Sequence, residues 1–140
     1  ELLESNGPSN LDEKPRNIPW TDSLSQRRYH EWSQQLPKYR RVLSLAKDIT
    51  ESWNGELIFV FLPNGGRYET PNLPHWQLKE DMLEIVNELG ISIIDSDSVI
   101  GDGDHRRHFP ANGGHYNGEG YRVVSEQVIA LIRQYQNNQL

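Results

Sequence analysis

The sequence contains no cysteine among its 140 residues, which excludes disulfide bonds, thiolate metal sites and cysteine nucleophiles. Basic residues are also scarce, because 14 Lys and Arg stand against 20 Asp and Glu. The formal charge of -6 therefore disfavours binding to nucleic acid or to an anionic membrane surface. No apolar run approaches the roughly 20 residues that cross a bilayer. The length suits one domain, and the composition does not identify a compartment.

Residues 1–23 hold three prolines and many Ser, Asn and Asp residues without a sustained apolar period. This composition predicts an irregular N-terminal arm over 1–23 and one folded unit over 24–140. Within that unit, apolar residues recur at helical spacing near 24–35, 38–53, 75–89 and 118–136. Pro37 separates the first two helices or kinks one long helix. We expect Gly90 to end the third helix in the left-handed conformation, and Asn117 to cap the fourth.

Two short apolar runs, near 56–62 and 91–95, predict strands buried in a parallel sheet. The order helix, strand, helix, strand, helix predicts an α/β fold with right-handed βαβ wiring. Two strands alone leave unpaired edges, so further strands must come from upstream sequence or from a second copy of the chain. We therefore expect the isolated chain to form a homo-oligomer.

Ligands of open α/β sheets bind beyond the carboxyl ends of the strands, where two loops of this chain should meet. One loop covers 63–74 and the other 96–116. His115 lies in the second loop, after two glycines and directly before the cap of the last helix. This position predicts a well-oriented general base. The alternative is a loop histidine that only hydrogen-bonds neighbouring backbone.

The segment 109–121, FPANGGHYNGEGY, resembles the C-terminal block of SGNH/GDSL hydrolases. The strand near 56–62 with its following Pro63, and the segment 89–95, are similar to the last two strands of such enzymes, so the likeness covers about residues 38–135. The resemblance implies a three-layer α/β/α fold of flavodoxin-like type, of which this chain carries the C-terminal part. It also implies hydrolysis of a small-molecule ester, an acylated lipid or carbohydrate, with no cofactor.

In that family a serine of a Gly-Asp-Ser block is the nucleophile and a C-terminal histidine is the base. Only the histidine maps onto this chain, at His115. Neither Gly-Asp-Ser nor Gly-x-Asn-Asp occurs in the sequence, so both blocks would precede Glu1 in a complete enzyme, and we expect the chain alone to hydrolyse esters negligibly. The family's acid often lies three residues before the histidine, where this chain has Asn112. A backbone carbonyl, Asp95, or a carboxylate from 97–104 is left to orient the base.

The two loops also supply the residues expected to contact substrate, which are Asn64, Arg67, Tyr68, Asn112 and Tyr116. Arg67 has an alternative role, an ion pair with Glu69 or another surface carboxylate.

Other patterns have simpler explanations. Asp102, Asp104, His105 and His108 could hold a divalent metal, but the arginines between the histidines favour a solvated loop, so no metal site is predicted. Three tryptophans are expected to pack in a core or groove: Trp32, Trp53 and Trp76. The alternative to an esterase is a non-catalytic α/β binding or assembly module derived from the same fold.

Overall fold

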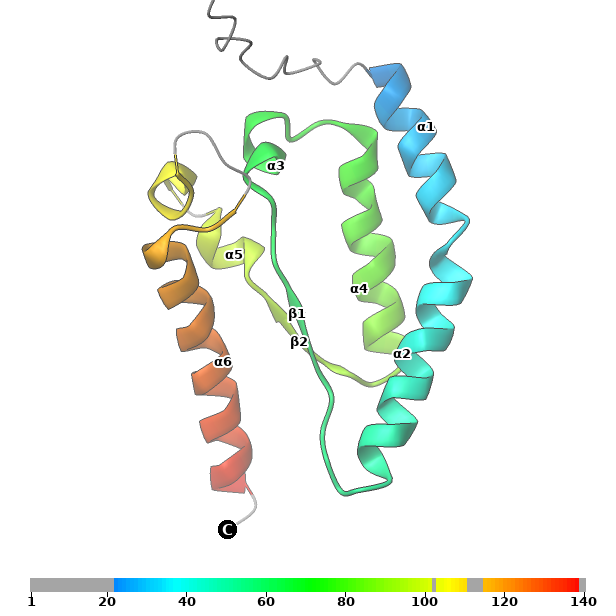
Figure 1. The fold of residues 1–140 in the computed structure, drawn as a ribbon, viewed down its shortest axis with the longest axis vertical. Coiled ribbons are helices and arrows are strands. Elements are labelled where there is room, and N and C mark those ends of the chain that lie inside the picture. The colour runs from blue at the N-terminus through cyan, green and yellow to red at the C-terminus, as the bar shows by residue number, and fades with distance from the viewer. Residues whose placement is uncertain (1–21, 102, 111–114, 139–140) are drawn as a thin grey trace, which may run out of the picture.

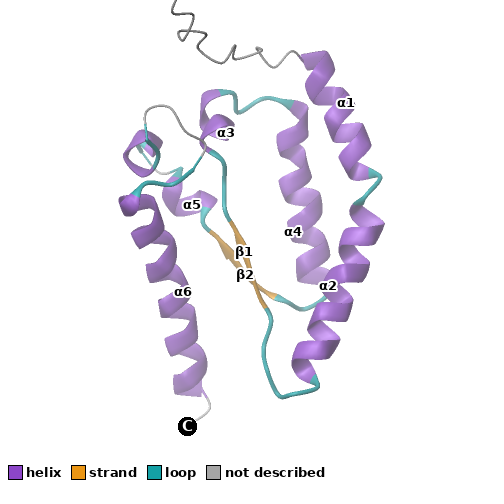
Figure 2. Cartoon of the chain, viewed as in Figure 1, coloured by secondary structure: helices purple, strands orange, loops and turns teal. Residues whose placement is uncertain are grey.

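The computed structural model describes residues 22–101, 103–110 and 115–138. Helices dominate these residues, and two short strands lie between them (Figure 2). In chain order the elements are α1 (Asp22–Ser33), α2 (Leu36–Glu51), β1 (Ile58–Phe61), α3 (Gly65–Glu69), η1 (Pro74–Gln77), α4 (Leu78–Glu88), β2 (Ser92–Asp95), α5 (Asp97–Ile100), η2 (His105–His108) and α6 (Gly118–Asn138).

The two strands pair in parallel, with Ile58 opposite Ser92 and Phe61 opposite Asp95. Helix α4 connects them, and it lies with α1 and α2 on one side of the strand pair, whereas α6 lies on the other (Figure 1). All four residues of β1 are apolar, and Ile93 and Ile94 form the apolar centre of β2, which suits a sheet covered by helices on its two faces. Of the strand residues only Ile94 is buried, and the others are half-buried. The predicted α/β class and the parallel strands are confirmed.

Local chemistry explains the ends of several helices. As predicted, Gly90 adopts a left-handed φ of 65° after α4. Asn54 likewise adopts a φ of 60° after α2. The Asn117 side chain accepts a hydrogen bond from the Gly120 N–H at 3.0 Å, which confirms it as the cap of α6. Pro37 lies in the first turn of α2, where its missing N–H costs no helical hydrogen bond, so two helices form.

Other boundaries differ from the sequence expectation. Helix α1 begins at Asp22, inside the predicted arm, and the rest of that arm lies outside the described residues. The third predicted helix divides into η1 and α4. The sequence did not predict α3, α5 or η2, because elements of four or five residues are too short to show a helical period.

The buried apolar residues gather where α4 covers the sheet and where the loops after the strands close over it. They are Leu73, Leu78, Ile85, Val86, Ile91, Ile94, Ile100 and Phe109. Trp53 was expected to pack in a core or groove, but it follows the end of α2 and its exposed fraction is 72%. Among the described helices, none has the length and apolar character needed to cross a bilayer.

Candidate functional site

The loops that follow β1 and β2 converge at the carboxyl end of the sheet. The Tyr116 hydroxyl donates a hydrogen bond to the Pro63 carbonyl at 2.7 Å, which joins the start of α6 to the end of β1. The Phe109 ring stacks on Tyr116 with centroids 4.9 Å apart. Phe109 also covers Gly65, where an added Cβ would lie 3.3 Å from the ring. Aromatic packing therefore holds the two loops together.

His115 lies beside this junction, next in sequence to the anchored Tyr116, and it is exposed. The residues after it are fixed, because the Asn117 N–H donates to the His108 carbonyl at 2.9 Å and the Asn117 amide donates to the Arg107 carbonyl at 2.8 Å. Within the described part of the chain, no hydrogen bond or ion pair of the His115 ring is found. The ring is thus on the surface at the carboxyl end of the sheet, where a general base was predicted.

Asp97, at the start of α5, is the centre of a partly buried ion network at the same end of the sheet. It accepts hydrogen bonds from Arg67 at 3.0 Å, from Lys79 at 2.7 Å and from the Tyr68 hydroxyl at 2.6 Å. These donors belong to α3 and to the first turn of α4. The network therefore ties three elements together across the ends of both strands.

The charges in this network shift the ionisation of its members. Burial opposes the ionised form of Asp97, but the hydrogen bonds of Lys79 and Tyr68 and the charges of Lys79 and Arg67 outweigh it, so the pKa of Asp97 is lowered. Burial and the hydrogen bond to Asp97 raise the pKa of the Tyr68 phenol. Burial also raises the pKa of the Tyr116 phenol to about 12, with the Asp97 charge acting in the same direction. Both phenols therefore stay neutral donors near pH 7.

Among the described residues, no hydrogen bond or ion pair joins Asp95 to His115. Its carboxylate pairs with Lys79 at 2.8 Å and accepts the Asp97 N–H at 3.1 Å. Lys79 belongs to α4, on the face of the sheet opposite α6. The role of Asp95 as the acid that orients His115 stays a prediction without a supporting contact.

The predicted substrate contacts have structural partners. Asn64 caps α3 by accepting the Gly66 N–H at 2.7 Å. Arg67 forms the ion pair anticipated as its alternative role, but its partner is the partly buried Asp97. Tyr68 stacks on His105 with centroids 5.0 Å apart. Asn112 lies outside the described residues, as do the other residues between 111 and 114.

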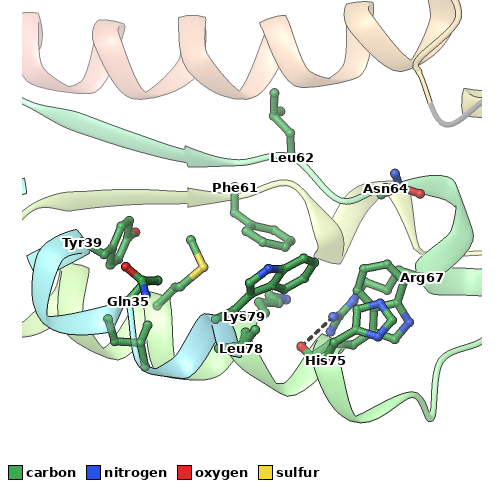
Figure 3. A pocket seen from close by; sticks show the side chains of 13 residues that line it. Gln35, Tyr39, Phe61, Leu62, Asn64, Arg67, His75, Leu78 and Lys79 are labelled. Atoms are coloured by element: carbon green, nitrogen blue, oxygen red, sulfur yellow. Dashed lines mark hydrogen bonds between the residues drawn. The ribbon is translucent and has the colours of Figure 1, made fainter. Parts of the chain in front are cut away.

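A cavity of about 350 Å³ lies between α2, α4 and the end of β1 (Figure 3). Phe61 points into it, and Arg67 and His75 lie close together at one end (Figure 3). Arg67 donates to the Trp76 carbonyl there at 3.1 Å. The lining residues are Trp32, Gln35, Leu36, Tyr39, Phe61, Leu62, Asn64, Arg67, His75, Trp76, Leu78, Lys79 and Met82. Asn64 and Arg67 thus face the cavity, whereas Tyr68 and Tyr116 are not among its lining residues.

His75 is a buried residue that the sequence did not single out. The Ser25 hydroxyl lies 2.7 Å from its Nδ1 and accepts its backbone N–H at 3.1 Å. Burial, together with the charge of Arg28, lowers the pKa of His75. Ser25 is fully buried, and its contacts with His75 join α1 to η1. The sequence does not predict this pair, because 50 residues separate Ser25 from His75 along the chain.

The alternative metal site finds no support in the part of the chain that is described, where no group of three or more His, Asp or Glu side chains could hold an ion. Asp102 lies outside the described residues.

Comparison of the chain with protein-family models, curated proteins and solved structures gave no match.

Proposed function

We propose that this chain supplies the general base, His115, of a Ser-His ester hydrolase of the SGNH/GDSL type. The serine belongs to polypeptide outside these 140 residues, and the two strands form part of a larger three-layer α/β/α sheet of flavodoxin-like type. The substrate is a small-molecule ester, an acylated lipid or carbohydrate, and no cofactor takes part.

The hydrogen bond from Tyr116 to the Pro63 carbonyl is the observation that carries the proposal. It holds the residue after His115 at the end of β1, which is the edge where parallel sheets bind ligands. The hydrogen bonds of Asn117 to the His108 and Arg107 carbonyls fix the backbone directly after Tyr116. An exposed imidazole next to a backbone segment anchored by these hydrogen bonds suits a general base, which must lie within hydrogen-bond distance of the hydroxyl it deprotonates.

The chemistry assigns one task to His115. Its neutral ring accepts the proton of a serine hydroxyl as that oxygen attacks the ester carbonyl, and it later returns the proton to the leaving alcohol. A chain with the base but without the serine lacks the atom that forms the acyl bond. The 140 residues alone should therefore react with neither an ester nor a serine-directed phosphonate.

The test compares phosphonate labelling of the full-length gene product with that of its variants. A fluorophosphonate probe should label one serine outside residues 1–140, and His115→Gln should slow labelling by roughly 10²–10⁴-fold, the usual contribution of a general base. The matched control is His30→Gln, because His30 is exposed on α1, across the sheet from α6. Labelling that does not depend on His115, or labelling of a serine within these residues, would contradict the proposal. Complete absence of labelling would favour the non-catalytic binding or assembly module.

A further inference from the structure

The cavity between α2, α4 and the end of β1 is large enough to hold a small molecule. Its volume of about 350 Å³ falls within the range of about 300–1,000 Å³ that is typical of ligand pockets. An apolar cavity of about 150 Å³ holds one benzene molecule. By the same measure, this cavity accommodates a ligand of about 12–14 non-hydrogen atoms, which is the size of two joined phenyl rings.

The wall of this cavity is almost entirely apolar. Four aromatic rings contribute to it, from Trp32, Tyr39, Phe61 and Trp76. The Phe61 ring points into the space between α2 and α4 (Figure 3). Because removal of apolar surface from water favours association, a wall of this kind selects an apolar ligand.

The charged residues at the cavity are already paired within the protein. The Arg67 guanidinium donates to the Asp97 carboxylate at 3.0 Å and to the Trp76 carbonyl at 3.1 Å. The Lys79 amine pairs with Asp95 at 2.8 Å and with Asp97 at 2.7 Å. Two cations thus face two carboxylates. An anionic ligand would lose its hydration without gaining an uncompensated positive charge, so the site favours an uncharged molecule.

The aromatic part of the wall is held in place before any ligand binds. The His75 ring centroid lies 6.0 Å from that of Trp32 and 4.0 Å from that of Trp76. The Trp76 indole N–H donates to the Thr70 carbonyl at 2.8 Å, and the His75 Nδ1 lies 2.7 Å from the Ser25 hydroxyl. A planar aromatic ligand can make face and edge contacts with these rings. It also loses less conformational freedom on binding than a flexible alkyl chain does.

We propose that this cavity binds an uncharged aromatic molecule of about the size of biphenyl. The site lies on the face of the sheet that α2 and α4 cover, whereas α6 covers the other face (Figure 1). His115 and Tyr116 are not among the lining residues. The inference therefore goes beyond the proposed function and does not depend on it.

Titration of the full-length gene product with biphenyl, followed by NMR, tests the site. Met82 lines the cavity and is the only methionine among the 140 residues, so its isotope-labelled methyl group is a specific reporter. The variant Met82→Leu identifies the signal of this methyl group. We expect saturable binding with nuclear Overhauser contacts between the Met82 methyl and the biphenyl protons. Saturable binding without such contacts, or no binding, would overturn the inference.

Two further probes test the chemical class of the ligand. Biphenyl-4-carboxylate should bind at least about tenfold more weakly than biphenyl, because its charge finds no unpaired cation in the cavity. The uncharged alkyl alcohol 1-decanol should bind at least about fivefold more weakly, because its chain loses rotational freedom. If either molecule bound as tightly as biphenyl, the assignment to an uncharged aromatic ligand would be wrong.

Two variants of α2 distinguish the cavity from the rest of the helix surface. Leu36 lines the cavity, whereas Val42 does not and is 63% exposed. Leu36→Trp enlarges a side chain of the wall and should weaken biphenyl binding at least about tenfold, whereas Val42→Trp should leave it unchanged. A folded Leu36→Trp that binds as tightly as the parent would contradict the inference. The Met82 contacts decide the question if Leu36→Trp does not fold.

Protein is the competing occupant of the cavity. If another segment or a second copy of the chain fills it in the full-length gene product, the Met82 methyl will contact protons of that segment and biphenyl will not bind, which overturns the inference. Binding should be unchanged in His115→Gln, and its loss there would contradict the location on the face covered by α2 and α4. If biphenyl contacts Met82 but no serine reacts with the phosphonate, this site stands and the hydrolase proposal fails.

Discussion

The first turn of α6 contains two glycines, and the same substitution should have opposite effects at the two positions. A Cβ added at Gly118 meets nothing within 4 Å, whereas a Cβ at Gly120 would lie 2.6 Å from the His108 carbonyl oxygen and 2.8 Å from Tyr116 Cδ1. Neither glycine has a positive φ. The contrast therefore depends on packing and not on backbone strain.

The magnitudes follow from these contacts. Gly118→Ala should stabilise the protein by about 0.5 kcal/mol, since alanine in a helix costs less backbone entropy than glycine. Gly120→Ala has the same favourable effect on backbone entropy, but the new methyl group must displace either Tyr116 or the His108 carbonyl, which accepts the Asn117 N–H. Overpacking of this kind costs about 1–3 kcal/mol, so the net effect should be a loss of about 1–2 kcal/mol.

Urea unfolding followed by tryptophan fluorescence measures both variants against the parent protein, and equal m-values would show that the same surface is exposed on unfolding. If Gly120→Ala proved as stable as the parent, α6 would not pack against η2 as described. The proposed function adds a second readout in the full-length gene product. There, Gly120→Ala should slow phosphonate labelling because it displaces the segment that carries His115, whereas Gly118→Ala should not.

Two further predictions concern polar contacts. Asp97→Asn should lower the free energy of unfolding by about 2–3 kcal/mol near pH 7, because it leaves Lys79 and Arg67 largely buried with less compensation; the exposed Asp48→Asn is the control. Because the pKa of Asp97 is lowered in the folded protein, its contribution to stability is present above the unfolded pKa of about 3.9 and is lost as the pH falls through the folded pKa. The difference in unfolding free energy between the parent and Asp97→Asn should therefore become smaller below about pH 4. Urea titrations in which this difference stays constant would contradict the reasoning. Ser25→Ala should lower the free energy of unfolding by about 1–3 kcal/mol in the same assay, because the ring Nδ1 and the backbone N–H of His75 lose a buried partner. A loss no larger than that caused by the exposed Ser125→Ala would refute this prediction.

Sequence patterns predicted the regular elements because their signals are local. The helical spacing of apolar residues located α1, α2, α4 and α6, and the short apolar runs located both strands. Gly90 and Asn117 marked helix ends correctly, since a left-handed residue and a capping side chain act within one turn. The position of His115 before α6 and at the carboxyl end of the sheet also followed from this order of elements.

Tertiary structure alone decided what joins distant segments. Asp97 could not be matched with Arg67 and Lys79 from the sequence, because a carboxylate in a loop has many possible partners and only the packing of α3 and α4 brings these two close. The exposure of Trp53 and the burial of Ser25 against His75 likewise depend on how α1 and α2 lie over the sheet. Local periodicity determines which face of an element is apolar, but only the three-dimensional arrangement of the elements determines whether another segment of the chain covers that face.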